Sequence, residues 1–172
     1  MNRIIMESLL QALPQELLTK IMWYTLESPH TDLECGILKH AMGAPIYNKL
    51  VNKGEIVKDK NGHVVKVDAS SVPWSERKRV KFDIAVLESL PNMTRFYLFD
   101  TGVTGDIQVL QGLRNLTSLW CGSTGVTGDI QVFQELPNLT FFTLRSTRVT
   151  GDKEVFHDYR KSHGLKECRV SM

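Results

Sequence analysis

The chain has 172 residues, 42% hydrophobic and 23% charged, a balance typical of a folded domain and unlike that of disordered, collagen-like or membrane proteins. Its net charge of +2 gives no overall field that would draw it to nucleic acid or anionic lipid. Cys35, Cys121 and Cys168 fit neither a disulfide framework nor a paired zinc pattern. They predict an intracellular protein, in the cytoplasm or the nucleus.

The first 50 residues are predicted to form a helical region. Residues 4–11 are interrupted by a carboxylate, a hydroxyl and an amide, so we expect neither a secretory leader nor membrane insertion. Residues 13–26 begin with Pro14 and Glu16, which suit a first helical turn. The apolar residues that then share one helical face are Leu17, Leu18, Ile21 and Met22.

Residues 13–24 read L-P-x-E-L-L-x-x-I-x-x-Y. This string resembles the first helix of an F-box, the motif by which substrate adaptors dock on the Skp-type subunit of ubiquitin ligases. The resemblance implies a ligase adaptor whose following repeats select a substrate. The alternative is that these helices cover one end of the core formed by the repeats.

Residues 51–78 are predicted to form a β-hairpin cap and a basic connector. Two strand-like segments within residues 55–68 flank Asn61 and Gly62, a strong hairpin signal. We expect Val65 and Val67 to face the core. The basic cluster that follows, Glu76-Arg-Lys-Arg-Val-Lys81, is interpreted as a solvated connector.

The second half of the chain repeats itself at a shift of 23 residues. Copies begin near Leu87, Leu110 and Phe133, and a partial copy precedes the first. The apolar positions that keep one phase are 90/113/136, 93/116/139, 96/119/142 and 98/121/144, with Cys121 as a small hydrophobic residue in a leucine position.

The repeated pattern L-x-x-L-x-L-x-x-T-x-V-T-G-D-I over residues 79–172 resembles a leucine-rich repeat of the plant-type class. The resemblance implies an α/β solenoid, a short right-handed array of parallel strands and helical returns closed by a carboxyl-terminal cap. It also implies protein binding on the concave face of the sheet. In this chain the positions of the family's asparagine ladder hold Thr101, Thr124 and Thr147.

Each copy is expected to contribute one strand, because apolar and more polar residues alternate there. Each Thr-Gly-Asp then reverses the chain, and its aspartate caps a short helical return. That capping role accounts for the repeated carboxylates without calcium, so no metal or cofactor is predicted. The capping residues are Asp83, Asp106, Asp129 and Asp152, and the threonines are expected to bond the turn backbone.

Exposed aromatic and arginine side chains on a rigid sheet favour protein binding. The sequence shows no recognisable catalytic arrangement, so we expect a non-catalytic interaction protein with a protein partner and no nucleic acid. A ligase adaptor and a structural subunit of a larger assembly remain as alternatives. The predicted contact residues on the concave face are Arg95, Tyr97, Phe99, Asp100, Trp120, Phe141, Thr143 and Arg145.

Overall fold

The computed structural model describes residues 30–172, which form a mixed α/β structure with parallel sheets. Two helices come first, α3 (His30–Met42) and α4 (Ala44–Asn52). Gly43 separates them with a φ of 81°, in the left-handed region that favours glycine. The helix predicted over residues 13–26, with its F-box-like string, lies outside the described residues.

A β-hairpin follows the helices, at the position predicted from Asn61-Gly62. Strands β1 (Ile56–Lys58) and β2 (Val64–Asp68) are antiparallel, with a register irregularity between Val57 and Lys58. Val67 is buried as expected. Val65 is only half-buried, and Val64 is the second buried valine because the irregularity shifts the alternation of side chains at this end of β2.

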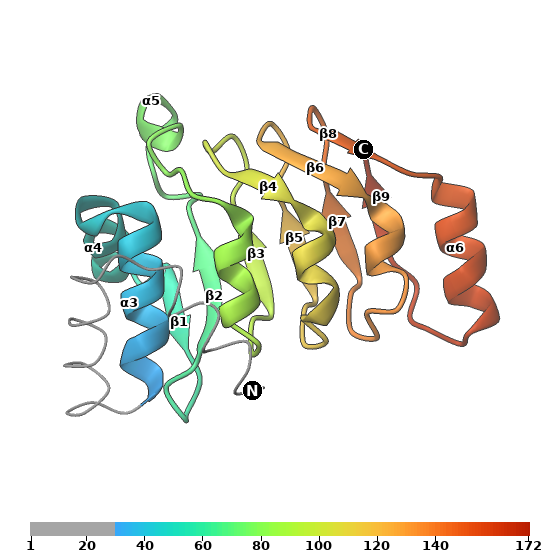
Figure 1. Cartoon of the computed structure of the whole chain (residues 1–172), viewed down its shortest axis with the longest axis horizontal. Coiled ribbons are helices and arrows are strands. Elements are labelled where there is room, and N and C mark those ends of the chain that lie inside the picture. The colour runs from blue at the N-terminus through green and yellow to red at the C-terminus, as the bar shows by residue number, and fades with distance from the viewer. Residues whose placement is uncertain (1–29) are drawn as a thin grey trace, which may run out of the picture.

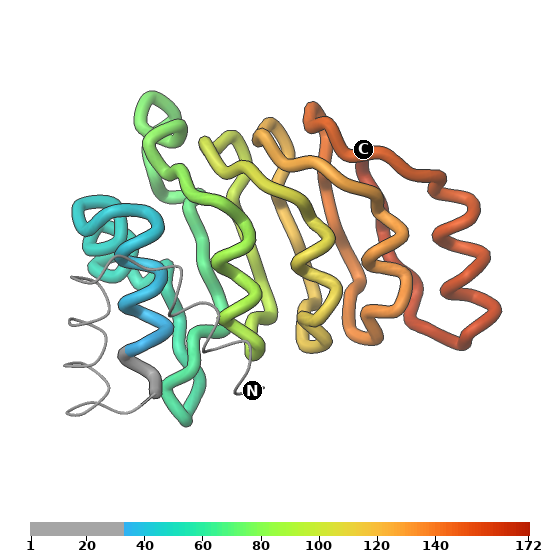
Figure 2. The backbone as a smooth tube through the Cα atoms, in the orientation of Figure 1, coloured from blue at the N-terminus to red at the C-terminus, as the bar shows by residue number. Residues whose placement is uncertain are grey.

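The main sheet has six strands in the order β1-β2-β3-β5-β7-β9, and every neighbouring pair beyond β1 and β2 is parallel. Phe96 stands in register with Leu119, and Leu119 with Phe142, so one step across the sheet equals 23 residues of sequence. The copies follow one another along the longest axis of the molecule (Figures 1 and 2). The strands after the hairpin are β3 (Arg95–Tyr97), β5 (Ser118–Trp120), β7 (Phe141–Thr143) and β9 (Arg169–Ser171).

Each copy contributes a second strand, which the sequence analysis did not predict. β4 (Thr104–Asp106), β6 (Gly125–Asp129) and β8 (Arg148–Thr150) form a separate three-stranded parallel sheet. The Val-Thr-Gly-Asp segments run extended and bond the copy before them, as when the Gly125 amide donates to the Val103 carbonyl at 2.8 Å. The expectation of one strand per copy was therefore wrong, because a segment treated as a turn also forms a ladder.

Every helical return begins directly after an aspartate. The carboxylate of Asp106 accepts a hydrogen bond from the Gln108 amide at 2.8 Å, and the other three aspartates make the equivalent bond. Gly105 and Gly128, just before two of these aspartates, have φ of 106° and 115°. The returns are the 3₁₀ helices η1 (Ile84–Ser89), η2 (Ile107–Gly112) and η3 (Ile130–Phe133), and the α-helix α6 (Lys153–Ser162).

The core lies between the main sheet and the row of helices that covers one of its sides (Figure 1). All of the phase-locked apolar positions predicted from the repeat are buried there. Phe142 joins sheet to helices, with its ring centroid 5.2 Å from that of Phe133 and 5.5 Å from that of Phe156. The repeat thus supplies one apolar column per position, stacked from copy to copy.

The basic segment after the hairpin is solvated only in part, since Lys78, Arg79 and Lys81 are exposed but Arg77 is not. Arg77 is the last residue of the short helix α5 (Trp74–Arg77) and is only 8% exposed. Its guanidinium donates to the carbonyls of Val72 and Ser70 at 3.0 and 2.6 Å and lies 4.0 Å from the centre of the Trp74 ring. Arg77 is buried because it satisfies the carbonyls of the tight loop that precedes it.

Candidate functional site

The side of the main sheet turned away from the core is called here the open face. In each repeat strand the middle residue, such as Leu119, points into the core, so the first and third residues point to the opposite side. The strand register aligns these residues into two columns across the sheet. The first column is Lys66, Arg95, Ser118, Phe141 and Arg169, and the second is Asp68, Tyr97, Trp120, Thr143 and Ser171.

Three rings from adjacent strands form an aromatic row on the open face: Tyr97, Trp120 and Phe141. The Trp120 ring lies 5.8 Å from that of Tyr97 and 4.7 Å from that of Phe141, centroid to centroid. Trp120 is 38% exposed, and its two neighbours are half-buried. Because each ring is braced by the next, the row presents apolar surface that has little rotamer freedom left to lose on binding.

Two predicted contact residues lie in the turn after β3 rather than on the sheet. The Phe99 ring packs edge-on against Trp74, with centroids 6.1 Å apart. Asp100 adopts a positive φ of 58° and pairs with Lys78 at 2.9 Å. Gly122 leaves the space that the Phe99 ring fills, since a Cβ there would come within 3.0 Å of it. Phe99 and Asp100 therefore shape the turn at the edge of the open face.

Thr143 is a correction to the predicted contact surface, because it is only 6% exposed. It occupies the second column, in register with Trp120. A short side chain beside a much larger one is screened from solvent, so the strand alternation alone overestimates its accessibility. Arg145, two residues further on, lies in the turn after β7 and is exposed.

The charged groups of the open face are unevenly paired. Lys66 contacts Asp68 at 2.9 Å and Glu55 at 3.6 Å, and the hydrogen bond with Asp68 raises the lysine pKa. Burial pushes the pKa of Asp68 upward, but hydrogen bonds from Ser70 and Lys66 outweigh it and the pKa is lowered. Lys66 also lies 5.7 Å from the centre of the Tyr97 ring. Both groups are thus charged and mutually neutralised near neutral pH.

The repeated threonines bond backbone at two different places. Thr101, Thr124 and Thr147 each donate to the carbonyl three residues earlier, closing the turn within their own copy. A second series links one copy to the next, as when the Thr117 hydroxyl donates to the Thr94 carbonyl at 2.8 Å. The sequence analysis did not identify this second series, although its 23-residue spacing is visible in the sequence. Its members are Thr94, Thr117 and Thr140.

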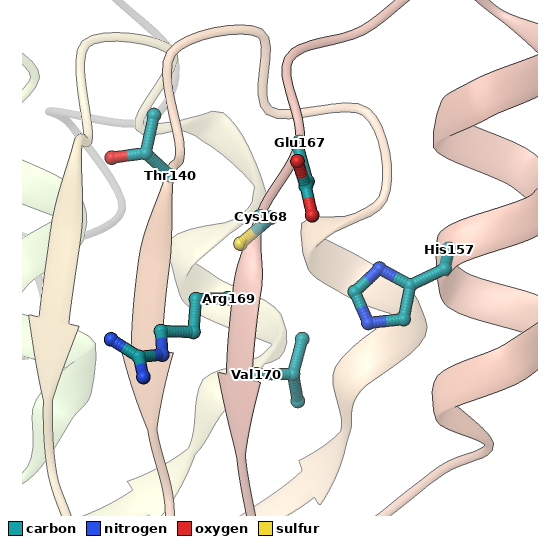
Figure 3. Close-up of a pocket in the computed structure, with 6 residues that line it drawn as sticks. All are labelled: Thr140, His157, Glu167, Cys168, Arg169 and Val170. Atoms are coloured by element: carbon teal, nitrogen blue, oxygen red, sulfur yellow. The ribbon is translucent and has the colours of Figure 1, made fainter.

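A hollow of about 510 Å³ lies at the carboxyl-terminal edge of the main sheet, lined in part by Thr140, the residue before Phe141 (Figure 3). His157 reaches toward it from α6, while Glu167 and Cys168 belong to the segment that leads into β9 and Arg169 is the first residue of that strand. Burial raises the pKa of the Cys168 thiol to about 11, so the thiolate is disfavoured. Cys168 is therefore not an activated nucleophile.

Sequence reasoning missed two side chains that stand out in the structure. Trp74 is 64% exposed. Its position directly after Pro73 indicates the start of a helix but does not indicate exposure of the ring. Arg160 is 2% exposed, although it lies in the carboxyl-terminal cap, where an arginine on a helix is usually exposed. Neither residue belongs to the repeat, so periodicity could not assign it a position.

The described residues contain no cluster of three His, Cys, Asp or Glu side chains arranged to hold a metal ion. Within residues 30–172 no helix has the length and apolar character needed to cross a membrane.

Neither a known protein family nor a curated protein matches the chain in sequence. Among solved structures it is similar to that of PEPR1-AtPEP1, with 16% identity and a TM-score of 0.49 over 72% of this chain and 20% of that one. It is also similar to two proteins of Listeria monocytogenes. For the internalin inlF the identity is 21% and the TM-score 0.42, over 79% of this chain and 35% of that one. For internalin C2 the identity is 20% and the TM-score 0.30, over 58% of this chain and 62% of that one. The chain thus spans about a fifth of the first of these structures.

Proposed function

We propose that the chain is a non-catalytic leucine-rich-repeat solenoid that binds a protein partner through the aromatic row. The fold side of the proposal is supported by parallel strands that recur every 23 residues in register. The functional side is supported above all by one observation: Trp120 remains 38% exposed while braced between the rings of Tyr97 and Phe141. Rigid, partly exposed tryptophan and tyrosine are the side chains most often found at binding hot spots.

A non-catalytic role fits the chemistry of the two buried cysteines. Burial raises the pKa of the Cys121 thiol to about 12, and Cys168 is raised to about 11, so both are protonated near neutral pH. All three cysteines are unpaired, which supports an intracellular location in the cytoplasm or nucleus. The ligase-adaptor alternative rests on residues 13–24, and a place in a larger assembly is the remaining alternative.

The proposal is tested by affinity capture from an extract of the source cells, with the full-length chain as bait. The double variant Trp120→Ala/Phe141→Ala should lose the captured partner by at least tenfold, because it removes two adjacent hot-spot rings. Both variant and wild type should give the same circular dichroism spectrum. The matched control is Val155→Ala, which removes an apolar side chain that is 54% exposed on α6, away from the row.

Partner retention by the double variant, with the protein folded, would exclude the aromatic row as the binding site. Capture of a Skp-type ligase subunit that is indifferent to both substitutions would instead support the adaptor alternative.

A further inference from the structure

The open face carries cations that have no anionic partner in the part of the chain that the structure describes. Arg95 on β3 and Arg169 on β9 lie in the first column on either side of Ser118 and Phe141, and both are exposed. Arg145 lies exposed in the turn just beyond the aromatic row. No guanidinium of these three takes part in an ion pair or a hydrogen bond among residues 30–172.

Three carboxylates close to the open face are already paired. Asp68 and Glu55 both contact Lys66, the register neighbour of Arg95, and Asp100 contacts Lys78. The capping aspartates of the repeats lie elsewhere, at the starts of the helical returns, and the exposed Glu167, two residues before Arg169, forms no ion pair with it. A chain whose net charge is only +2 thus holds unneutralised arginines around the aromatic row.

We propose that the open face binds an extended acidic segment of a partner protein. Carboxylates of this segment pair with Arg95 and Arg169, and a large apolar side chain of the segment packs on the aromatic row between the two arginines. This inference rests on the proposed function. Arginine pairs with carboxylates through two parallel hydrogen bonds, so exposed arginines beside an apolar anchor give such a segment both orientation and charge complementarity.

The spacing of the strands sets the spacing of the carboxylates. Arg95 on β3 and Arg169 on β9 are separated by three steps across the sheet, about 14 Å at the usual spacing between strands. An extended peptide advances roughly 3.5 Å per residue, so two acidic residues about four positions apart span this distance. The expected segment is acidic at both ends with a bulky apolar residue near the middle.

Single-stranded nucleic acid is the competing ligand, since arginines and aromatic rings also bind it. The observations favour the acidic peptide, because a single-stranded nucleic-acid site usually spans about 4–16 nucleotides, each with its phosphate, which is more than the three unpaired arginines can contact.

The test is selection of random twelve-residue displayed peptides on the full-length chain, followed by fluorescence anisotropy of the selected peptides. We expect selected peptides to place Asp or Glu on both sides of a large apolar residue and to need Trp120. Arg95→Glu/Arg169→Glu should weaken their binding at least tenfold, and Arg95→Gln/Arg169→Gln by less. The matched control Arg114→Glu/Arg148→Glu reverses two exposed arginines off the open face and should change affinity less than twofold.

Three results would overturn the inference. Peptides that need Trp120 but show no acidic preference and no response to the Arg95 and Arg169 substitutions would refute it while leaving the proposed function intact. If no selected peptide depended on Trp120, the proposed function itself would fail. If a fluorescein-labelled twelve-nucleotide oligothymidine displaced the peptides and lost affinity in the Arg95→Glu/Arg169→Glu variant, the face would be a nucleic-acid site instead.

Discussion

The regular copies and the two ends of the described chain are held together in different ways. In the copies, the same small interactions recur at every step: a threonine to the preceding copy, an aspartate cap and a stack of apolar columns. At the ends, single buried charged residues connect neighbouring segments: Glu34 at the helical end and Arg160 at the carboxyl-terminal end.

Arg160 shows how much one such residue can organise. Burial lowers the pKa of its guanidinium, yet that group has no carboxylate partner among the described residues. It donates instead to carbonyls at the end of η3 and in the loops beside α6, where a cation is favourable. The acceptors are Phe133, Gln134, Leu136, Leu139 and Lys166, at 2.8 to 3.3 Å.

A repeated interaction can thus be deduced from its spacing in the sequence, whereas a solitary one cannot. The ends and the copies are expected to respond differently to substitution, and four variants measure that difference.

The largest effect is expected for Arg160→Ala. It leaves buried carbonyls without donors, so we expect a loss of about 3 kcal/mol or more in the free energy of unfolding. Arg160→Lys should recover only part of this stability, since an ammonium group cannot reach five acceptors in the guanidinium geometry. Urea titration checks this, with Lys161→Ala as an exposed neighbour that should change stability by at most ~0.5 kcal/mol. Equal stability of the Arg160 and Lys161 variants would contradict the assigned role.

A smaller loss is expected within the copies for Gly128→Ala. Its φ of 115° is unfavourable for alanine, and a Cβ there would lie 2.5 Å from the Asp106 carboxylate. We expect a destabilisation of about 1–3 kcal/mol, measured by thermal unfolding. Gly112→Ala is the control, because nothing lies within 4 Å of its Cβ and its φ is not positive. A neutral Gly128 variant would show that the copies do not approach as closely as described.

Next in size is Asp106→Ala, which removes one cap of a series. Loss of a single N-cap lowers stability by about 1 kcal/mol. Asp106→Asn should keep most of the stabilisation by the cap, because an acceptor oxygen remains. Chemical denaturation of the three proteins distinguishes these values. An alanine variant as stable as wild type would mean that the neighbouring copies compensate for the missing bond.

The smallest effect concerns pH and the helical end. The Glu34 carboxylate accepts from the His63 ring at 2.9 Å and from the Val64 amide at 2.6 Å, joining α3 to the hairpin. The hydrogen bond with Glu34 raises the pKa of His63 and outweighs burial, which lowers it. The stability that protonated His63 gains from Glu34 is therefore complete below the ordinary histidine pKa of 6.5. It is lost as the pH rises through the higher pKa of His63 in the folded protein.

His63→Gln should remove this pH dependence, so stability measured from pH 5 to 9 should fall more steeply in wild type than in the variant. Identical slopes would mean that the pair makes no titratable contribution.

Much of the fold follows from the sequence because its apolar phase never slips: Phe96, Leu119 and Phe142 were assigned to one buried column, and they form it. The second sheet was missed because Val-Thr-Gly-Asp satisfies the pattern of a turn as well as that of a short strand. Arg160 was missed because an arginine on a helix is usually exposed, and no spacing predicts that carbonyls will converge on it.

The open face was predictable in outline and less so in detail. Alternation placed Tyr97 and Trp120 on one side of the sheet, in register. It could not show that Thr143 is screened by its surroundings or that Phe99 packs against Trp74, because both depend on the sizes of side chains from other segments. Trp74 had no periodic position at all.

Trp120 is the central residue of the proposed contact surface for a partner. Label the tryptophans of the full-length chain with 5-fluorotryptophan, assign the Trp120 signal with a Trp120→Phe variant, and titrate with the captured partner while recording fluorine NMR spectra. We predict that the Trp120 signal shifts or broadens in proportion to bound partner. A saturating partner that leaves this signal unchanged would contradict the proposed binding site.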